Sequence, residues 1–248
     1  MNACTDQLVM MLVPRDRIVS VSYLAADPDT SVLADKAEGL PVNHGLAEEI
    51  LPLKPDLVVA GRYSARAGVS LLKKLGFNVL DLEPENSLQG FRDNLRIVAR
   101  AVGEEEKAER IIADFDARLE RLEKRASKTS LIFANYGANG MTSGAGTMVA
   151  DVVHHAGMTT LGEKLGFSGT RIISLEQLLA SAPDIIDADI YRNSGPARAN
   201  ENFRHPAFRI LKDRAETVSI PTRYWVCGTP KTLDALETLI DAAEDRAP

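Results

Sequence analysis

The chain has 248 residues, of which 45% are hydrophobic and 26% are charged, the balance of an ordinary globular protein. This length suits one large domain or two lobes of about 100 residues each. The net charge is −6 at pH 7, without the basic excess of a nucleic-acid-binding protein, and no stretch approaches the roughly 20 apolar residues of a membrane span.

The first part of the chain alternates strands and helices. Short apolar runs predict strands at 17–21, 57–60 and 78–82. Between the last two strands, residues 67–75 carry apolar side chains at helical spacing. Such strand–helix–strand alternation is typical of a parallel sheet in an α/β protein.

A long helix is predicted in the middle of the chain. Residues 104–126 contain neither Gly nor Pro, and their apolar side chains recur at steps of three and four. A helix of about 23 residues is about 35 Å long, which is enough to run along one lobe or to join two.

The α/β pattern resumes after this helix. Apolar runs predict strands at 130–134 and 184–186, and helical spacing predicts helices at 148–156 and 230–243. An α/β half therefore precedes the long helix and another follows it.

The two halves share a local pattern. Residues 48–58 and 176–186 each read as a Glu, a short amphipathic helix, a Pro-Asp turn and a buried strand. This joint is common in α/β proteins, but one copy on each side of the long helix favours two equivalent lobes. We therefore predict an α/β fold of two Rossmann-like lobes joined by one long backbone helix. The expected parts are an N-terminal lobe (1–103), a connecting helix (104–127) and a C-terminal lobe (128–248).

These segments resemble the helical-backbone class of ABC-importer solute-binding proteins, which includes cobalamin- and ferric-siderophore-binding members. The most specific match is the E-x-I-L-x-L-x-P-D-L-V segment at 48–58, followed by the order of parts around the long helix. The resemblance covers nearly the whole chain. It implies that a small-molecule metal chelate binds in a cleft between the lobes.

The resemblance also gives two glutamates a role. Glu48 and Glu176 hold the positions of surface carboxylates, one per lobe, that pair with arginines of the ABC transporter permease subunits. Two such charges steer docking and set its register more than they add affinity. The other interpretation is that each Glu lies in the first turn of a helix, where a negative charge favours the helix dipole.

The beginning of the chain departs from the family pattern. Met1 is not followed by the basic and apolar regions of a signal peptide, which by itself predicts a cytoplasmic protein. Members of the family are exported, and they usually carry another strand before the segment that resembles residues 2–8. We therefore expect a truncated form or an upstream start, and we expect a periplasmic location from the resemblance.

The two cysteines lie near opposite ends of the chain. Cys4 and Cys227 lack the spacing of metal ligands. They form either one long-range disulfide or two free thiols.

Candidate ligand contacts follow the predicted strands. In open α/β sheets, ligands bind beyond the carboxyl ends of strands. Three strand ends each supply a Tyr, which offers a flat apolar face with a polar tip, and two also supply Arg, which suits anionic groups. Such a lining fits an anionic, partly aromatic chelate, although surface loops often carry the same residues. The candidates are Arg62, Tyr63, Arg66, Tyr136, Tyr191 and Arg192, together with Trp225, which either faces the cleft or packs in the core.

The sequence assembles neither a metal site nor a catalytic site. Among the four histidines, the adjacent His154 and His155 point to different sides of a helix. The Gly-rich segment 140–146 lacks the Gly-Lys-Ser/Thr of a P-loop, and we expect a flexible loop beside the cleft, whose backbone amides could meet an anion. We therefore predict no catalytic residue and no cofactor, with metal present only within a bound chelate.

The combined prediction is a monomer that binds a metal chelate and a permease, and that does not bind nucleic acid. One alternative is a cytosolic α/β enzyme acting on a nucleotide or sugar, which needs a base or nucleophile that the sequence does not supply. Another is a binding module that senses a chelate without transport. A long helix as the main joint also predicts that the lobes move little on binding.

Overall fold

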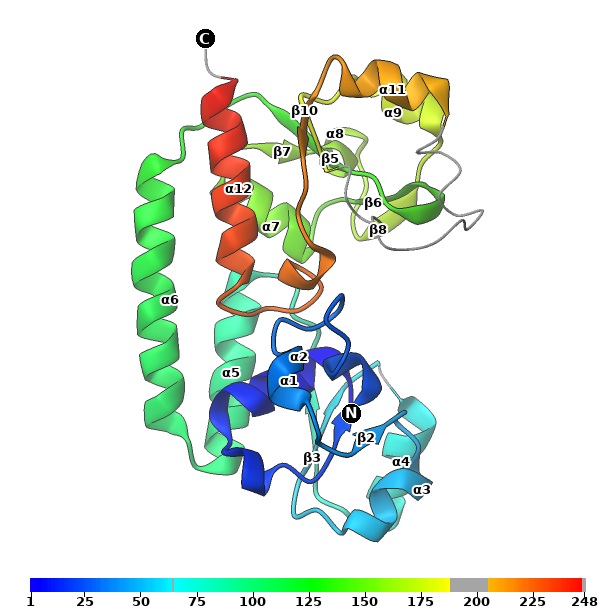
Figure 1. Ribbon diagram of the computed structural model, residues 1–248, viewed down its shortest axis with the longest axis vertical. Helices are drawn as coiled ribbons and strands as arrows, with labels where there is room; N and C mark the ends of the chain where they lie inside the picture. Colours follow the sequence, from blue (N-terminus) through cyan, green and yellow to red (C-terminus); the bar gives the residue numbers. More distant parts are fainter. Residues whose placement is uncertain (64, 188–204, 247–248) are drawn as a thin grey trace. The chain divides into compact units, whose positions relative to one another are not determined.

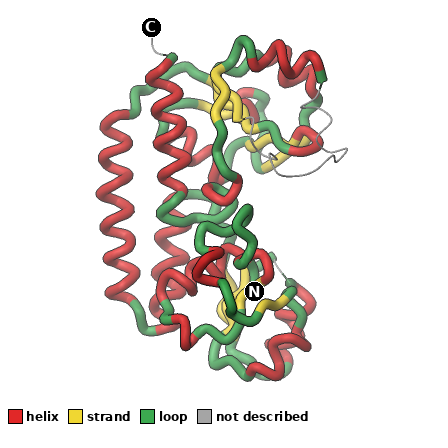
Figure 2. The backbone as a smooth tube through the Cα atoms, in the orientation of Figure 1, coloured by secondary structure: helices red, strands yellow, loops and turns green. Residues whose placement is uncertain are grey.

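The structure is a computed structural model that describes residues 1–63, 65–187 and 205–246. The chain divides into two compact units, each built from helices and strands (Figures 1 and 2). Unit 1 comprises residues 1–116 and 226–231, and unit 2 comprises 117–225 and 232–248. The division falls within the long helix rather than at its ends, and the segment 226–231 belongs to unit 1 instead of the expected C-terminal lobe.

The described residues of unit 1 form two pairs of parallel strands. β1 (Val21–Ser22) pairs with β2 (Val42–Asn43), and β3 (Val58–Gly61) pairs with β4 (Val79–Leu82). A cavity of about 380 Å³ is lined both by residues next to β1 and by residues of β3. The helices of this unit are α1 (Ala3–Leu12), α2 (Ala34–Ala37), α3 (Ala47–Ile50), α4 (Arg66–Lys74) and α5 (Leu88–Val102).

Most of the elements predicted in this part of the chain are confirmed, and one is shorter than expected. The strands predicted at 57–60 and 78–82 correspond to β3 and β4. The strand predicted at 17–21 is wrong over most of its length. Residues 15–17 form a short 3-10 helix, and pairing begins only at Val21, because β2 is two residues long.

The long helix α6 (Glu105–Arg125) confirms the prediction of an unbroken helix of this length. Its first half belongs to unit 1 and its second half to unit 2. Apolar side chains at steps of three and four are buried: Ala108, Ile112, Phe115, Leu119 and Leu122. None of the helices in the described part of the chain combines the length and the apolar character needed to cross a bilayer.

The described part of unit 2 has a parallel sheet with the strand order β10-β9-β5-β7 and an antiparallel pair, β6 with β8. The sheet strands are β5 (Ile132–Asn135), β7 (Thr159–Thr160), β9 (Ile185–Asp187) and β10 (Glu216–Val218). The antiparallel strands are β6 (Met141–Ser143) and β8 (Thr170–Ile172). The helices are α7 (Met148–His155), α8 (Leu161–Lys164), α9 (Leu175–Ser181), α11 (Pro206–Lys212) and α12 (Thr232–Asp245).

The local pattern shared by the two halves is a structural equivalence. In unit 1, α3 leads through a short 3-10 turn to Lys54, Pro55 and β3. In unit 2, α9 leads to Ala182, Pro183 and β9. Lys54 and Ala182 both adopt the left-handed conformation, with φ of 45° and 42°. The same reversal from helix to strand therefore precedes a core strand in each unit.

The Gly-rich segment is not the flexible loop that the sequence predicts. Residues 141–143 form β6, and the amides that follow are used within unit 2. Gly144 N donates to Gly169 O at 2.8 Å, and Ala145 N donates to Phe167 O at 3.1 Å. A Cβ at Gly144 would lie 2.3 Å from Phe167 O, so the glycine serves close backbone packing rather than anion binding.

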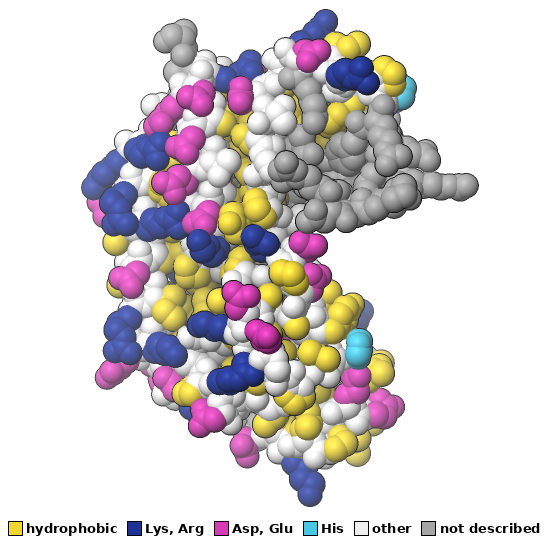
Figure 3. Space-filling model, in the orientation of Figure 1, with side chains coloured by type: hydrophobic (Ala, Val, Ile, Leu, Met, Phe, Trp, Pro, Cys, Tyr) yellow, Lys and Arg dark blue, Asp and Glu magenta, His cyan; other side chains and the backbone are white. Residues whose placement is uncertain are grey.

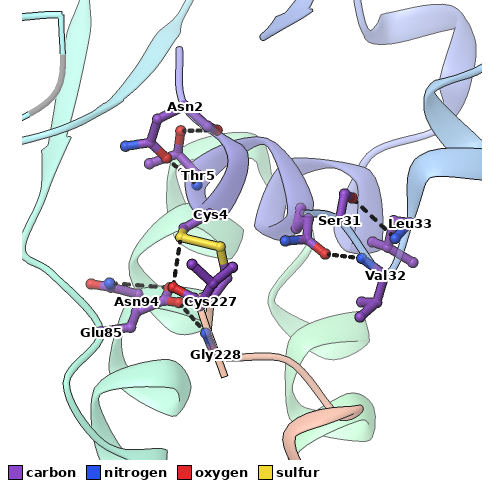
Figure 4. Close-up of a disulfide and its surroundings, with 12 residues drawn as sticks. Asn2, Cys4, Thr5, Ser31, Val32, Leu33, Glu85, Asn94, Cys227 and Gly228 are labelled. Carbon is purple, nitrogen blue, oxygen red and sulfur yellow. Dashed lines mark hydrogen bonds between the residues drawn. A yellow bond between two sulfur atoms is a disulfide. The ribbon is translucent and has the colours of Figure 1, made fainter. Parts of the chain in front are cut away.

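Cys4 and Cys227 form a disulfide, with Cα atoms 5.0 Å apart (Figure 4). The bond joins α1 to the segment 226–231 across 223 residues of sequence. Of the two alternatives that the sequence left open, the structure therefore has the cross-link, and it explains why 226–231 lies with unit 1.

Candidate functional site

A buried ionic contact links β1 and β3 of unit 1. The Met1 ammonium lies 2.9 Å from the Asp6 carboxylate and donates to Val59 O, in β3, at 2.7 Å. The other carboxylate oxygen of Asp6 accepts from Ser22 N, at the end of β1, at 2.6 Å. Asp6 of α1 therefore holds the end of β1, and the Met1 ammonium connects this carboxylate to β3.

The residues that follow β3 and β4 line one cavity of about 210 Å³. Arg62 and Tyr63 come directly after β3, and Arg62 forms an ion pair with Glu83, which comes directly after β4. Tyr63 is 66% exposed. Arg66, the first residue of α4, lines an adjacent pocket together with Arg62. The structure therefore brings together the three candidates that the sequence placed in the first lobe.

Glu85 lies in the same cavity and was missed by sequence reasoning. Its carboxylate accepts from Gly228 N at 2.8 Å and from the Asn94 side-chain amide at 3.3 Å, beside the disulfide (Figure 4). Burial raises the pKa of Glu85 to about 7. No sequence pattern indicates this contact, because Gly228 lies 143 positions further along the chain.

A second group of side chains follows β1 and β2. Tyr23 and His44 stack with ring centroids 5.0 Å apart, and His44 Nδ1 lies 2.8 Å from the Glu49 carboxylate. Val42 and Leu46, on either side of His44 in the sequence, are exposed. Hydrophobic side chains on the surface of unit 1 are visible among charged ones in Figure 3. No pattern in the sequence distinguishes His44 from the other three histidines or indicates this group.

Among the candidates in unit 2, Tyr136 is not exposed at the end of its strand as expected. Tyr136 follows β5 but is fully buried, and its ring packs against Phe208 at 6.1 Å. Trp225 is 8% exposed, with its ring 5.9 Å from that of Phe133. Both side chains therefore lie in the core of unit 2. For Trp225 the sequence left two positions open, the cleft and the core, and the structure has the core position. Tyr191 and Arg192 lie outside the described residues.

Unit 2 instead exposes an apolar pair that the sequence did not suggest. Met141 on β6 is paired with Ile172 on β8, and Ile172 is 70% exposed. Next to Ile172, the guanidinium of Arg171 lies 5.4 Å from the centroid of the Phe167 ring. The alternating pattern of such short strands is too brief to be recognised in the sequence.

Glu48 and Glu176 occupy equivalent positions in their units. Each is exposed in the first turn of a short helix, α3 and α9. Hydrogen bonding from Ser174, the N-cap of α9, lowers the pKa of Glu176, so this carboxylate is ionised at neutral pH. Both positions suit the helix dipole, and both leave the side chain accessible to a partner.

Within the described residues, no three or more His, Cys, Asp or Glu side chains are grouped so that they could hold a metal ion.

Comparison with known families identifies the chain. A model of the periplasmic binding protein family matches residues 1–197. The chain belongs to this family. Its members bind solutes rather than catalyse reactions, and membership indicates an extracytoplasmic location.

Two curated relatives match part of the chain. The vitamin B12-binding protein of Salmonella typhimurium is 31% identical over 164 residues, which cover 62% of this chain and 59% of the relative. An uncharacterized ABC transporter substrate-binding lipoprotein of Bacillus subtilis, YvrC, is 26% identical over 118 residues, or 46% of this chain and 37% of the relative. The chain thus spans less than two thirds of the length of either relative.

The similarity of fold to solved structures extends over nearly the whole chain. The periplasmic haem-binding protein RhuT of Roseiflexus sp. RS-1 superposes with a TM-score of 0.78 over 98% of this chain and 97% of its own, at 19% identity. The predicted α/β fold class and the family resemblance are confirmed.

Proposed function

We propose that the protein is the solute-binding component of an ABC importer, which captures a metal chelate and delivers it to the membrane permease. The observation that carries the proposal is the family match over residues 1–197. The B12-binding relative and the haem-binding neighbour favour a chelate, either an iron–siderophore or a cobalamin-like molecule. The substrate-binding lipoprotein among the relatives favours an ABC permease as the partner.

The side chains of unit 1 suit this ligand class. Arg62, Arg66 and Tyr63 lie at the carboxyl end of β3, where cationic groups and a flat aromatic face can meet an anionic, partly aromatic molecule. We propose that Glu48 and Glu176 dock on the permease, that the protein acts in the periplasm as a monomer, and that it has no resident cofactor. Metal then arrives only within its chelate.

Binding of a chelate panel to the purified protein tests the proposal. Ferric catecholate and hydroxamate siderophores, haemin and cobalamin are each titrated while the fluorescence of Trp225 and the tyrosines is followed, with equilibrium dialysis as the direct measurement. One class should bind saturably, with a Kd of about 1 μM or lower. A folded protein that binds none of them would overturn the proposed function.

A further inference from the structure

One stretch of unit 1 differs from the rest of the chain in charge. The chain has 35 acidic residues among 248 and a net charge of −6, yet residues 57–80 contain no Asp or Glu. The same stretch contains four cationic residues, which are Arg62, Arg66, Lys73 and Lys74. Positive charge is therefore concentrated in one part of an acidic chain.

Three of these cations belong to α4 and are exposed. Arg66, Ser70 and Lys74 follow one another at steps of four, so they lie on one face of the helix. Lys73 is exposed beside them, and all four side chains line one pocket of about 340 Å³. Because like charges at this spacing repel one another, such a face favours an anionic partner.

Only part of this positive charge is neutralised within unit 1. Lys73 forms an ion pair with Asp81 on β4, and Arg62 forms one with Glu83. The other two cations of the stretch make no ion pair with any residue that the structure describes. The pocket therefore keeps an excess of positive charge that an external anion can neutralise.

Apolar side chains lie next to the cations on the same helix. Leu71 and Leu75 are one turn apart, and they are 40% and 52% exposed. Val69 and Leu72, on the opposite side of α4, are buried and hold the helix against unit 1. Exposed leucines beside cations are typical of helices that lie on a membrane, where the apolar side chains enter the lipid interface. An acidic protein surface would use the cations alone.

The exposed cations, the hydroxyl and the leucines form one surface, which we call the α4 surface: Arg66, Ser70, Leu71, Lys73, Lys74 and Leu75. We propose that the α4 surface binds the anionic phospholipid headgroups of a membrane. The cations meet the lipid phosphates, and the two leucines enter the interface between headgroups and acyl chains.

The position of α4 gives this contact a purpose. α4 packs beside α3, which carries Glu48 (Figure 1). Lipid binding next to a docking carboxylate holds the protein at the membrane that contains its permease. This purpose rests on the proposed function, whereas the lipid contact itself goes beyond it and requires neither a chelate nor a permease.

Cosedimentation of the purified protein with lipid vesicles tests the proposal. The wild type should bind vesicles of phosphatidylcholine that contain about one third phosphatidylglycerol, and should bind pure phosphatidylcholine at least about tenfold more weakly. Binding should weaken as salt is raised, because salt screens the charges. Inorganic phosphate at constant ionic strength should not displace the protein, since a free ion offers no apolar interface.

Two double variants separate the contributions of charge and apolar surface. Lys73→Gln/Lys74→Gln should lower the partition onto anionic vesicles by roughly 5- to 25-fold, since each cation near such a surface contributes about fivefold. Leu71→Gln/Leu75→Gln should lower it by roughly tenfold, because less apolar surface enters the interface. Melting curves of both variants check that they are folded.

The matched control is Arg121→Gln/Lys124→Gln, which removes the same charge from an exposed side of α6. Lys124 makes an ion pair with Glu120, as Lys73 does with Asp81, so each double variant breaks one such pair. The control should bind anionic vesicles as the wild type does. An equal loss in the control would show an effect of net charge and would overturn the proposal.

Other results would overturn the membrane contact and leave the proposed function intact. They are a folded wild type that binds chelate but no anionic vesicles, unchanged vesicle binding in either α4 variant, and displacement by inorganic phosphate. Normal vesicle binding by Lys73→Gln/Lys74→Gln with weaker stimulation of the permease would show an acidic protein partner instead. A wild type that binds vesicles as expected but binds no chelate would defeat the proposed function alone.

Discussion

At the residue scale, the burial of Glu85 in the cavity after β3 and β4 makes the stability of the fold depend on pH. Its pKa is about 7 in the folded chain, against an ordinary value of 4.5, because the carboxyl is buried. The folded protein therefore binds more protons than the unfolded chain between pH 4.5 and about 7. Stability that is fully present below pH 4.5 is lost as the pH rises through 7, and the difference corresponds to about 3 kcal/mol at most.

The variant Glu85→Gln tests this pH dependence. A neutral amide can still accept from Gly228 N but cannot ionise, so the variant should lose less stability than the wild type between pH 5 and pH 8. Urea unfolding at both pH values measures the change. The control is Glu83→Gln, an exposed neighbour that follows the same strand. Parallel pH profiles of Glu85→Gln and the wild type would contradict the prediction.

The site residues show what the sequence could and could not predict. The position directly after a buried strand predicts correctly that Arg62 and Tyr63 line a cavity at the end of β3, and their contact with a ligand stays a prediction. The same position failed for Tyr136, because Phe208, about 70 residues later, packs on its ring. His44 and Glu85 were missed because their properties depend on partners, Glu49 and Gly228, that a pattern of residue types does not assign.

At the element scale, the segment 226–231 is held to unit 1 by the Cys4–Cys227 disulfide and by the Glu85 contact to Gly228. The disulfide closes a loop of 223 residues, so it constrains the unfolded chain strongly. The chain-entropy model assigns such a loop about 5 kcal/mol. The cross-link should therefore be a major source of stability.

The double variant Cys4→Ser/Cys227→Ser should melt roughly 10 °C below the wild type, since 1 kcal/mol shifts the melting temperature of a chain this long by roughly 2 °C. Circular dichroism with and without reductant measures the effect. Reductant should lower the melting temperature of the wild type and leave that of the double variant unchanged. A wild type whose thiols become reduced, as labelling shows, but whose melting temperature stays constant would argue against this role.

Element prediction succeeded where the pattern was long. The 21 residues of α6 repeat their apolar spacing over several turns, and the strands beginning at Val58 and Val79 are bounded by clear turn residues. Strands of two or three residues, such as β2, β7 and β10, are too short for an alternation of apolar and polar residues to be recognised in the sequence. The ion pairs of Arg118 and Arg125 with α12 were also missed, because they join residues more than 100 positions apart.

At the scale of the whole molecule, the fold class was predictable because the order of elements limits the topology. The predicted boundaries differ from the limits of the two compact units. They divide the chain into consecutive ranges. The segment 226–231 nevertheless belongs to unit 1, through the disulfide to Cys4 and the hydrogen bond from Gly228 to Glu85. The order of residues along the chain does not indicate that a segment near the C-terminus packs in the N-terminal unit.

The proposed docking role of Glu48 and Glu176 belongs to this scale, because it needs one carboxylate from each unit. Each single change to Ala should weaken stimulation of the cognate permease's ATP hydrolysis by roughly threefold to fivefold, as an exposed ion pair contributes at most about 1 kcal/mol. The double variant should lose about the product of the two factors, and its affinity for the chelate should stay unchanged. The losses should shrink at high salt, which screens exposed charges.

The control for docking is Glu106→Ala, an exposed glutamate on α6 whose side chain is 95% accessible. Charged side chains line α6 in Figure 3, so loss of one of them tests whether net charge alone matters. If Glu106→Ala weakens stimulation as much as Glu48→Ala does, the effect is one of general charge. If neither Glu48→Ala nor Glu176→Ala changes stimulation at low salt, these carboxylates serve only the first turns of α3 and α9. The two Ala variants would then stimulate ATP hydrolysis normally but would be less stable than the wild type, because the favourable contact with the helix dipole is removed.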